Sequence, residues 1–245
     1  MRNITDTVKH LLIINVIFFI ATLALGDIVF DLFALHYPYN PKFQFWQPLT
    51  HMFMHGDLGH IFFNMFALYM FGIPIEQMWG RNKFIFFYLS TGFGAASLQL
   101  GLYYFQISEI SELLISMGQT RSQIATFFET RDISYALIEQ IGRDKLLSGL
   151  SSFNSVMVGA SGALYGVLVA FAFLFPNARL MLLFPPIPIK AKVLVPLLIL
   201  GDLFFGFTSY SIGPIAHFAH LGGAITGLIM MWYWKKNQFD QNRWD

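Results

Sequence analysis

Cysteine is absent from the sequence, and charged residues are scarce. Without cysteine the chain can form no disulfide bond, no thiolate metal site and no cysteine nucleophile. Charged residues make up only 12% of the 245 residues, about half of the roughly 25% that soluble domains carry. The net charge is +1 and no basic patch is interleaved with aromatic residues, so the sequence gives no sign of nucleic-acid binding.

Apolar residues take the place of charge, because 56% of the chain is hydrophobic and 18% is aromatic. A helix needs about 20 residues to cross a hydrocarbon core of about 30 Å, and six apolar segments come close to that length. The sequence therefore predicts an all-α polytopic membrane protein, a six-transmembrane-helix bundle in one domain over residues 1–245. The predicted spans are Leu11–Phe30, Leu58–Met78, Phe84–Phe105, Val156–Phe175, Val193–Tyr210 and Ile215–Trp234.

The distribution of lysine and arginine predicts how the bundle is oriented. Cytoplasmic connections carry an excess of these residues. With the N-terminus inside, ten of the 15 lie in inner segments, so both termini are predicted to be cytoplasmic. The inner residues are Arg2, Lys9, Arg81, Lys83, Arg179, Lys190, Lys192, Lys235, Lys236 and Arg243, and the outer ones are Lys42, Arg121, Arg131, Arg143 and Lys145.

The longest connection, Gln106–Phe153, mixes charge with apolar residues at helical spacings, such as Ile124 and Phe127. This pattern predicts an extramembrane insertion at about residues 106–155, with one or two amphipathic helices on the outer membrane surface or over the bundle. A mobile tether with partial helix fits the composition equally well. The inner connection Phe175–Val193 is rich in proline and is predicted to be an extended linker.

A single serine stands among small residues in the fourth predicted span. Ser161 lies between Gly159 and Gly162, with Gly166 one turn further on. Small residues at such spacing let membrane helices approach closely, and packing alone would account for the string. The alternative is that Ser161 is a nucleophile, and the other spans have to decide between the two interpretations.

The last predicted span contains a histidine that matches this serine. His220, Gly223 and Gly227 share one helical face, which can press against the glycine-lined face around Ser161. Both polar residues stand near the outer start of their spans, so we expect them at similar depth. Polar groups inside a membrane are costly and mark function by default. A serine beside a histidine is the arrangement of a base-activated nucleophile.

Three further residues of the sequence fit such a site. His60 and Asn64 are spaced i, i+4 near the outer end of the second span, and they either donate hydrogen bonds to an oxyanion or form an interhelical polar pair. Tyr165, one turn after Ser161, either stacks on the imidazole of His220 or packs in the core.

Four strings together carry a resemblance to a known family. They are HMFMHGDLGHIFFN (His51–Asn64), GIPIEQMWG (Gly72–Gly80), GASGALYG (Gly159–Gly166) and AHLGGAITG (Ala219–Gly227). From about Trp46 to Leu228 the chain resembles the rhomboid family of intramembrane serine proteases, of the bacterial type. The resemblance implies a rhomboid-like bundle and an enzyme that cleaves transmembrane segments through an acyl-enzyme. It implies no metal and no cofactor.

The resemblance also implies a role for each candidate residue. Ser161 would be the nucleophile and His220 its general base, and the Ser161 N–H would form the oxyanion hole with His60 and Asn64. Tyr165 would pack on His220, and the supporting glycines would hold the helices together; these are Gly159, Gly162, Gly223 and Gly227. The partners would be transmembrane-helix substrates and membrane lipids. The location would be a bacterial inner membrane, with the site opening to the outer side.

Such enzymes work with a dyad and no carboxylate, and the sequence places no acidic residue at the depth of His220. Asp202 is expected to be a polar contact near the inner half of span five. The chain departs from the family pattern in two ways: Gln47 follows Trp46 where many members carry arginine, and the insertion is long for a bacterial member.

Other functions fit the sequence less well. A zinc protease would need a glutamate directly after the first histidine of a His-Glu-x-x-His motif, but Met52 follows His51. An aspartyl protease would need a second aspartate in a span core, and a transporter would need paired charges or broken helices in repeated halves. The remaining alternative is an inactive rhomboid-like binder or chaperone of transmembrane helices. His51 and His55 are expected to tie the first loop to span two by hydrogen bonds, and His217 to be an interfacial histidine with solvent access.

Overall fold

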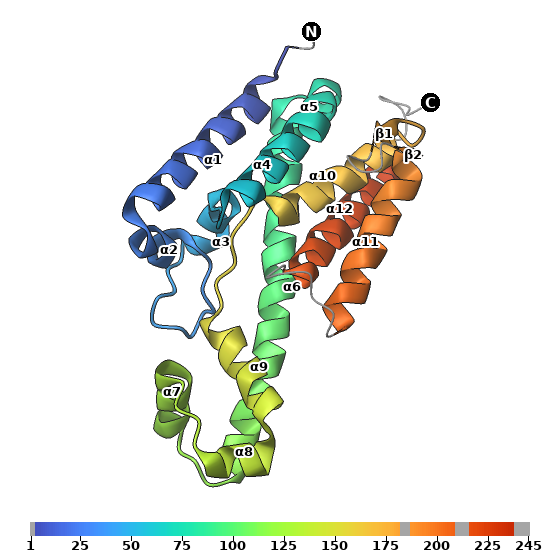
Figure 1. Ribbon diagram of the computed structural model, residues 1–245. Coiled ribbons are helices and arrows are strands. Elements are labelled where there is room, and N and C mark those ends of the chain that lie inside the picture. The colour runs from blue at the N-terminus through green and yellow to red at the C-terminus, as the bar shows by residue number, and fades with distance from the viewer. Residues whose placement is uncertain (1–2, 182–186, 209–215, 238–245) are drawn as a thin grey trace.

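The computed structural model describes residues 3–181, 187–208 and 216–237, which fold as a bundle of helices with a helical insertion at one end (Figure 1). The bundle is built from a few long helices and short connecting elements. The long ones are α1 (Asp6–Leu25), the continuous helix α4 (Leu58–Ala67)–η2 (Leu68–Gly72)–α5 (Ile73–Trp79), α6 (Arg81–Ser116), α10 (Ser161–Leu174), α11 (Ala191–Phe207) and α12 (His217–Asn237). The short ones are α2 (Asp27–Phe33), α3 (Gln47–Thr50), η1 (His51–Phe53) and the antiparallel strands β1 (Arg179–Met181) and β2 (Pro188–Lys190).

Three of the described helices are long and apolar enough to cross a membrane: Asp6–Leu25, Leu58–Trp79 and Arg81–Ser116. The helix α10 is apolar but shorter. Six spans and cytoplasmic termini therefore remain predictions. Parts of these predictions lie outside the described residues, namely Arg2, Arg243 and the stretch 209–215, which covers the end of the fifth predicted span, the connection after it and the first residue of the sixth.

The surface of α1 shows what surrounds the bundle. This helix is apolar on all sides, and only 22% of its most apolar window is buried. A helix that is apolar all round belongs in a protein core or in a membrane. Because Ile13, Ile17 and Leu23 are exposed, the helix is not in a protein core, and lipid is the solvent that suits it.

The start of α1 is held by a carboxylate from α5. Glu76 accepts hydrogen bonds from the backbone N–H groups of Thr7 and Val8, both at 3.0 Å, and from the hydroxyl of Thr5 at 2.5 Å. The first N–H groups of a helix have no partner within the helix. Glu76 is only 6% exposed, so it supplies those partners where water cannot.

A buried glutamine fixes the first loop, at the position where the sequence departs from the family pattern. The side chain of Gln47 is completely buried. Its Nε2 donates to the carbonyls of Asp31 and Lys42, at 3.0 and 2.9 Å, and its Oε1 accepts from the N–H of His36 at 3.2 Å. Gln47 therefore anchors the loop without a positive charge.

The insertion is more ordered than either of its two sequence interpretations. The helix α6 runs on to Ser116 instead of ending near Phe105, and three helices follow it: α7 (Arg121–Thr130), α8 (Tyr135–Ile141) and α9 (Arg143–Asn154). They gather around the far end of α6, away from the β1–β2 hairpin, rather than over the bundle (Figure 1). The sequence becomes less apolar at residue 106, but Ile107, Ile110 and Leu114 continue the helical spacing and are buried in the insertion.

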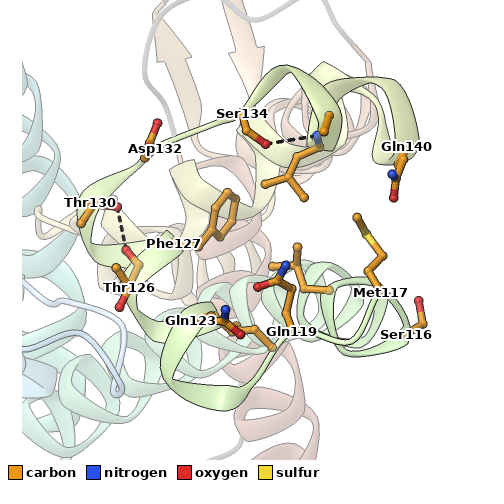
Figure 2. Close-up of a pocket in the computed structure, with 14 residues that line it drawn as sticks. Ser116, Met117, Gln119, Gln123, Thr126, Phe127, Thr130, Asp132, Ser134 and Gln140 are labelled. Atoms are coloured by element: carbon orange, nitrogen blue, oxygen red, sulfur yellow. Dashed lines mark hydrogen bonds between the residues drawn. The ribbon is translucent and has the colours of Figure 1, made fainter.

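The insertion contains a cavity of about 730 Å³ between α7, α8 and the end of α6 (Figure 2). Its lining is mixed, with Met117 and Phe127 beside Gln123 and Gln140. Asp132 is the one charged side chain among the residues that line it. Its walls belong entirely to the insertion, and none of them comes from α10, α11 or α12.

We expect Glu76→Ala to lower the free energy of unfolding by about 1–3 kcal/mol, because two buried N–H groups at the start of α1 lose their acceptor. The measurement is chemical unfolding of the full chain in detergent. The control is Glu109→Ala, which removes an exposed ion pair with Lys145 and should change the stability by less than about 1 kcal/mol. Equal losses for both variants would contradict the capping role of Glu76.

Candidate active site

Ser161 is the first residue of α10, so the helix starts five residues later than the predicted Val156. Two interactions hold the preceding segment extended: Met157 pairs with Leu35 in both directions, at 2.9 and 3.0 Å, and the N–H of Gly159 donates to the carbonyl of His51. Gly159 has φ +117°, a conformation that favours glycine. The turn at Gly159 thus fixes the start of α10 at Ser161. The apolar pattern of the sequence did not show this boundary.

The position of Ser161 at the helix start leaves donors free beside its hydroxyl. The first hydrogen bond of the helix runs from the N–H of Leu164 to the carbonyl of Ala160. The N–H groups of Ser161, Gly162 and Ala163 therefore have no acceptor within the helix. The positive end of the helix dipole lies at the same place and favours negative charge there.

The helix α10 is shorter than a hydrocarbon core is thick. Its 14 residues span about 21 Å at 1.5 Å per residue, against a hydrocarbon core of about 30 Å. Non-helical backbone at membrane depth is tolerated only where protein buries it or where it lines a water-filled cavity. Met157, Gly159 and Ala160 are buried, which meets that condition for the segment before Ser161.

Glycines bring α10 and α12 into backbone contact. A Cβ atom on Gly223 would overlap the carbonyl oxygen of Gly162, and one on Gly227 would lie 2.8 Å from the Cα of Gly166. A Cβ atom on Gly162 would meet the Cβ of Ala95 in α6 at 2.5 Å. These approaches leave no space for side chains, as expected for small residues at membrane helix contacts.

This contact brings the two predicted catalytic residues together. The Nε2 atom of His220 lies 2.9 Å from the Oγ of Ser161. The ring of Tyr165 stacks on the imidazole of His220, with centroids 4.2 Å apart and an angle of 9° between the planes. Of the two interpretations offered for Tyr165, the structure has the stacked one.

The predicted oxyanion donors lie on α4. A Cβ atom on Gly159 would be 2.7 Å from the Nε2 of His60 and 3.6 Å from the Oγ of Ser161, so the His60 ring and the serine hydroxyl border the same space. Asn64 is 6% exposed, and its Nδ2 has no hydrogen-bond partner among the described residues. A buried amide donor without a partner is rare enough to need an explanation.

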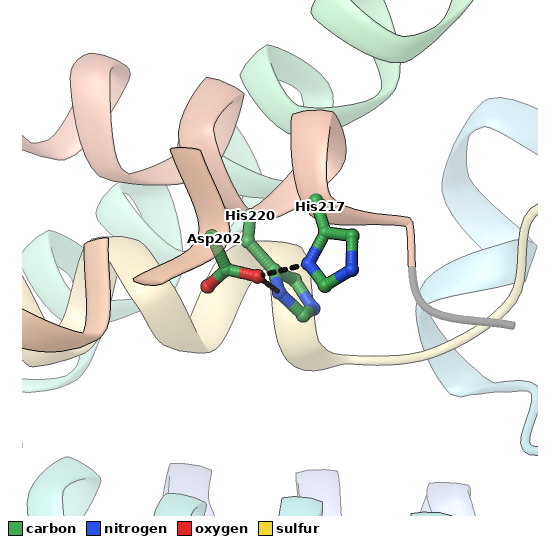
Figure 3. A group of neighbouring side chains, drawn as sticks. All are labelled: Asp202, His217 and His220. Carbon is green, nitrogen blue, oxygen red and sulfur yellow. Dashed lines mark hydrogen bonds and ion pairs between the residues drawn. The ribbon is translucent and has the colours of Figure 1, made fainter. Parts of the chain in front are cut away.

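The expectation that no carboxylate reaches His220 is wrong. The Oδ1 of Asp202 lies 3.0 Å from the Nδ1 of His220 and 2.6 Å from the Nδ1 of His217 (Figure 3). The helix α11 ends at Phe207, so Asp202 stands in its last turns, level with the start of α12, and not near its inner half.

His217 also differs from its prediction. It is 8% exposed and paired with Asp202, so it is a buried partner of the site and not an interfacial residue open to solvent. Asp202, His217 and His220 offer three possible metal ligands within 4.8 Å of one another. The two imidazole N–H donors account for the arrangement, and a cation at this place would have to displace both hydrogen bonds.

The two histidines of the first loop do not make the bonds predicted for them. The Nδ1 of His51 lies 3.0 Å from the carbonyl of Gln47 in the same loop, so this bond does not tie the loop to the second predicted span. Both ring nitrogens of the buried His55 lack a hydrogen-bond partner among the described residues, and its ring packs edge-on against His60 with centroids 4.9 Å apart. Burial lowers the pKa of His55 to about 4, so this ring is neutral at pH 7 and supports His60 by packing.

A bundle of apolar helices with a serine and a histidine paired between two of them is typical of an intramembrane hydrolase of the serine type. The Rhomboid domain family matches residues 42–127 and 133–237, which include every candidate site residue. The chain belongs to the rhomboid family. It is a membrane protein, and its family acts on transmembrane segments of membrane proteins.

A curated relative agrees with this assignment. Over 186 residues the chain is 26% identical to "Rhomboid protein 1, mitochondrial" of Saccharomyces cerevisiae (strain ATCC 204508 / S288c). The alignment covers 75% of this chain and 40% of the relative, so the chain spans less than half of the length of that protein. The relative is mitochondrial by name, and the bacterial type that the sequence suggested is not established by it.

We expect Gly223→Ala to destabilise the fold by about 1–3 kcal/mol or more, because α10 and α12 must separate to admit the added methyl group. The measurement is the thermal unfolding midpoint in detergent. The matched control is Gly201→Ala in α11, where the new methyl group would meet no atom within 4 Å and should stabilise the helix slightly. A Gly223→Ala midpoint equal to or above that of the parent would contradict the backbone contact.

Proposed function

We propose that this chain is a serine endopeptidase that cleaves transmembrane segments of other membrane proteins within the bilayer. The observation that carries the proposal is the 2.9 Å contact between the Oγ of Ser161 and the Nε2 of His220. A serine hydroxyl is a weak nucleophile until a base accepts its proton. His220 is in place to do so, and the family match supports the class of reaction.

The chemistry begins with transfer of the Ser161 proton to the Nε2 of His220 as Oγ attacks the scissile carbonyl. His220 then gives this proton to the leaving amine, and the acyl group remains on Ser161. A water molecule, deprotonated by His220 in the same way, releases the acid product and restores the serine. The reaction requires no metal and no cofactor.

Negative charge on the carbonyl oxygen develops beside donors that are already in position. The free N–H of Ser161 and the dipole of α10 favour this charge, as do Asn64 and His60 from α4. Fixed donors of this kind stabilise a transition state without reorganising. Gly159 leaves room for the His60 ring, since any larger residue would meet it.

The substrate is proposed to be a membrane helix, because the site is set below the surface. A peptide bond inside a helix is shielded, so the substrate must unwind locally before Ser161 reaches it. Residues that weaken a helix would lower the cost of unwinding, and small side chains beside the scissile bond are expected from the family resemblance. Lipids surround both enzyme and substrate.

The lysine and arginine distribution supports six spans with both termini cytoplasmic and a site that opens outward. We propose a bacterial inner membrane as the location, and a single membrane domain that carries the insertion. The inner connections gather accordingly: the start of α1, the end of α5 and the β1–β2 hairpin lie at one end of the molecule (Figure 1). The insertion lies at the other end.

We expect Ser161→Ala and His220→Ala each to abolish cleavage of a transmembrane reporter while the protein stays folded in detergent. A fluorescent fluorophosphonate should label the parent and not Ser161→Ala, because only an activated serine reacts. Cleavage by Ser161→Ala would disprove the mechanism. If the parent neither reacts with the probe nor cuts the reporter, the chain is a binder of transmembrane helices and not a protease.

We expect Asn64→Ala to weaken cleavage without abolishing it. Loss of one oxyanion donor raises the barrier by at most about 3–4 kcal/mol, or a factor of about 10²–10³ in kcat. The measurement is kcat for the transmembrane reporter, with circular dichroism to show that the helix content is unchanged. A kcat equal to that of the parent would remove Asn64 from the oxyanion site.

A further inference from the structure

We propose that Asp202 is a positioning residue for the Ser161–His220 pair, and that His217 holds its carboxylate in place. The inference rests on the proposed function, since it assigns the residues that orient the base of that reaction. It adds a third residue to the Ser161–His220 pair. The carboxylate comes from α11 and the second histidine from α12.

The carboxyl group of Asp202 is buried and hydrogen-bonded. It is 6% exposed and accepts hydrogen bonds from His217 and His220. A buried carboxylate is costly unless it is hydrogen-bonded and paired. Two imidazole donors of α12 converge on the same oxygen of this carboxylate, so it is held as a single acceptor beside His220.

That acceptor decides which nitrogen of His220 carries the proton. An ionised carboxylate can only accept hydrogen bonds, so the Nδ1 of His220 must carry hydrogen where it faces Asp202 at 3.0 Å. The neutral ring then has its lone pair on Nε2, which faces the Oγ of Ser161 at 2.9 Å. The hydrogen bond made by one ring nitrogen sets the tautomer of the other. Asp202 thus aims the basic nitrogen at the serine.

His217 and Tyr165 fix the two partners of this bond. His217 lies 2.6 Å from the same Oδ1 atom, and its ring stacks with Phe205, with centroids 5.9 Å apart. Tyr165 stacks on the His220 ring. The carboxylate and the imidazole are therefore both held from a second direction, and neither can rotate without breaking a further contact.

The close fit of α11 against α12 keeps this cluster together. A Cβ atom on Gly206 would lie 3.2 Å from the ring of Phe218 and 3.4 Å from the Cβ of His217. Gly206 stands one turn beyond Asp202, so the two helices approach closely at the level of the carboxylate. The position of Asp202 relative to His220 is set by this packing and not by a loop.

The test is Asp202→Asn in the full chain in detergent, with fluorophosphonate labelling of Ser161 measured across pH. We expect the second-order rate constant at pH 7.5 to fall at least about tenfold, since the corresponding change in a serine protease triad costs about 10⁴-fold. We also expect the acidic limb of the pH–rate profile to move to lower pH, because an imidazole without a neighbouring carboxylate binds its proton less tightly. A merely structural role would not move that limb.

The variant leaves the other titratable groups around His220 unchanged. These are His60 and Asp57 on the α4 side, Tyr165 of α10 and His217 of α12. His217→Asn should reduce the rate constant less than Asp202→Asn does, because the carboxylate keeps its hydrogen bond from His220. If His217→Asn lowers the rate constant as much as Asp202→Asn or more, the conclusion that His217 acts through Asp202 is contradicted.

Glu76→Gln is the matched control, because Glu76 is also 6% exposed and also hydrogen-bonded, but at the start of α1, where it accepts three hydrogen bonds. Its labelling rate per folded molecule should equal that of the parent. If Asp202→Asn does not fold, Asp202→Glu replaces it: the charge remains while the oxygen is displaced, so the rate constant should fall.

The outcomes separate the inference from the proposed function. A parent that is labelled, with an Asp202 variant that matches its rate constant and its pH profile, overturns the role of Asp202 and leaves the proposed function intact. A parent that is neither labelled nor active on a transmembrane reporter overturns both. A slower variant with a shifted acidic limb, beside an unaffected Glu76→Gln, supports the positioning role.

Discussion

The contact between the backbones of α10 and α12 is the constraint on which the site depends. Gly223 lies against the carbonyl of Gly162, and Gly227 lies against Gly166. In a lipid environment apolar burial gives no net drive for helices to associate, so close packing has to supply it. The same absence of side chains lets a serine on one helix meet a histidine on the other at hydrogen-bond distance. The glycines are thus required both for the packing of the two helices and for the contact between Ser161 and His220. A larger residue at one of these positions would disturb both.

Several polar side chains buried in the bundle tie one structural element to another. Glu76 joins α5 to α1, Gln47 joins the first loop to α2, and Asp202 joins α11 to α12. Without water, a carboxylate or amide with no partner costs several times more than it does at a surface. Each such group therefore specifies how its helices are placed. The few charged residues that the composition allows inside are concentrated where they determine geometry.

Much of the site was readable from spacing, and its missing part has a physical reason. Glycines at helical intervals predicted the helix contact, and matched positions near the start of two spans predicted that Ser161 and His220 meet. Asp202 was missed because depth was counted from the ends of apolar runs, and these ends are not the ends of helices. The same error placed the start of α10 at Val156 and the end of α6 near Phe105. Hydropathy shows where a run of apolar residues begins and ends. The start and end of a helix depend instead on backbone hydrogen bonds and on residues with positive φ, such as Gly159.

A short extended segment joins the insertion to Ser161, and the chain is held by contacts at two places before it reaches Ser161. The end of α6 and the helix α9 run antiparallel, with Gln106 bonded to Ser152 and Ile110 packed where a side chain on Gly149 would lie. After these contacts, the chain is held a second time where Met157 pairs with Leu35. Changes of length or sequence in α7 and α8 are therefore insulated from Ser161 by two successive anchors. A change of sequence in α7 or α8 is therefore expected to leave the contact between Ser161 and His220 in place.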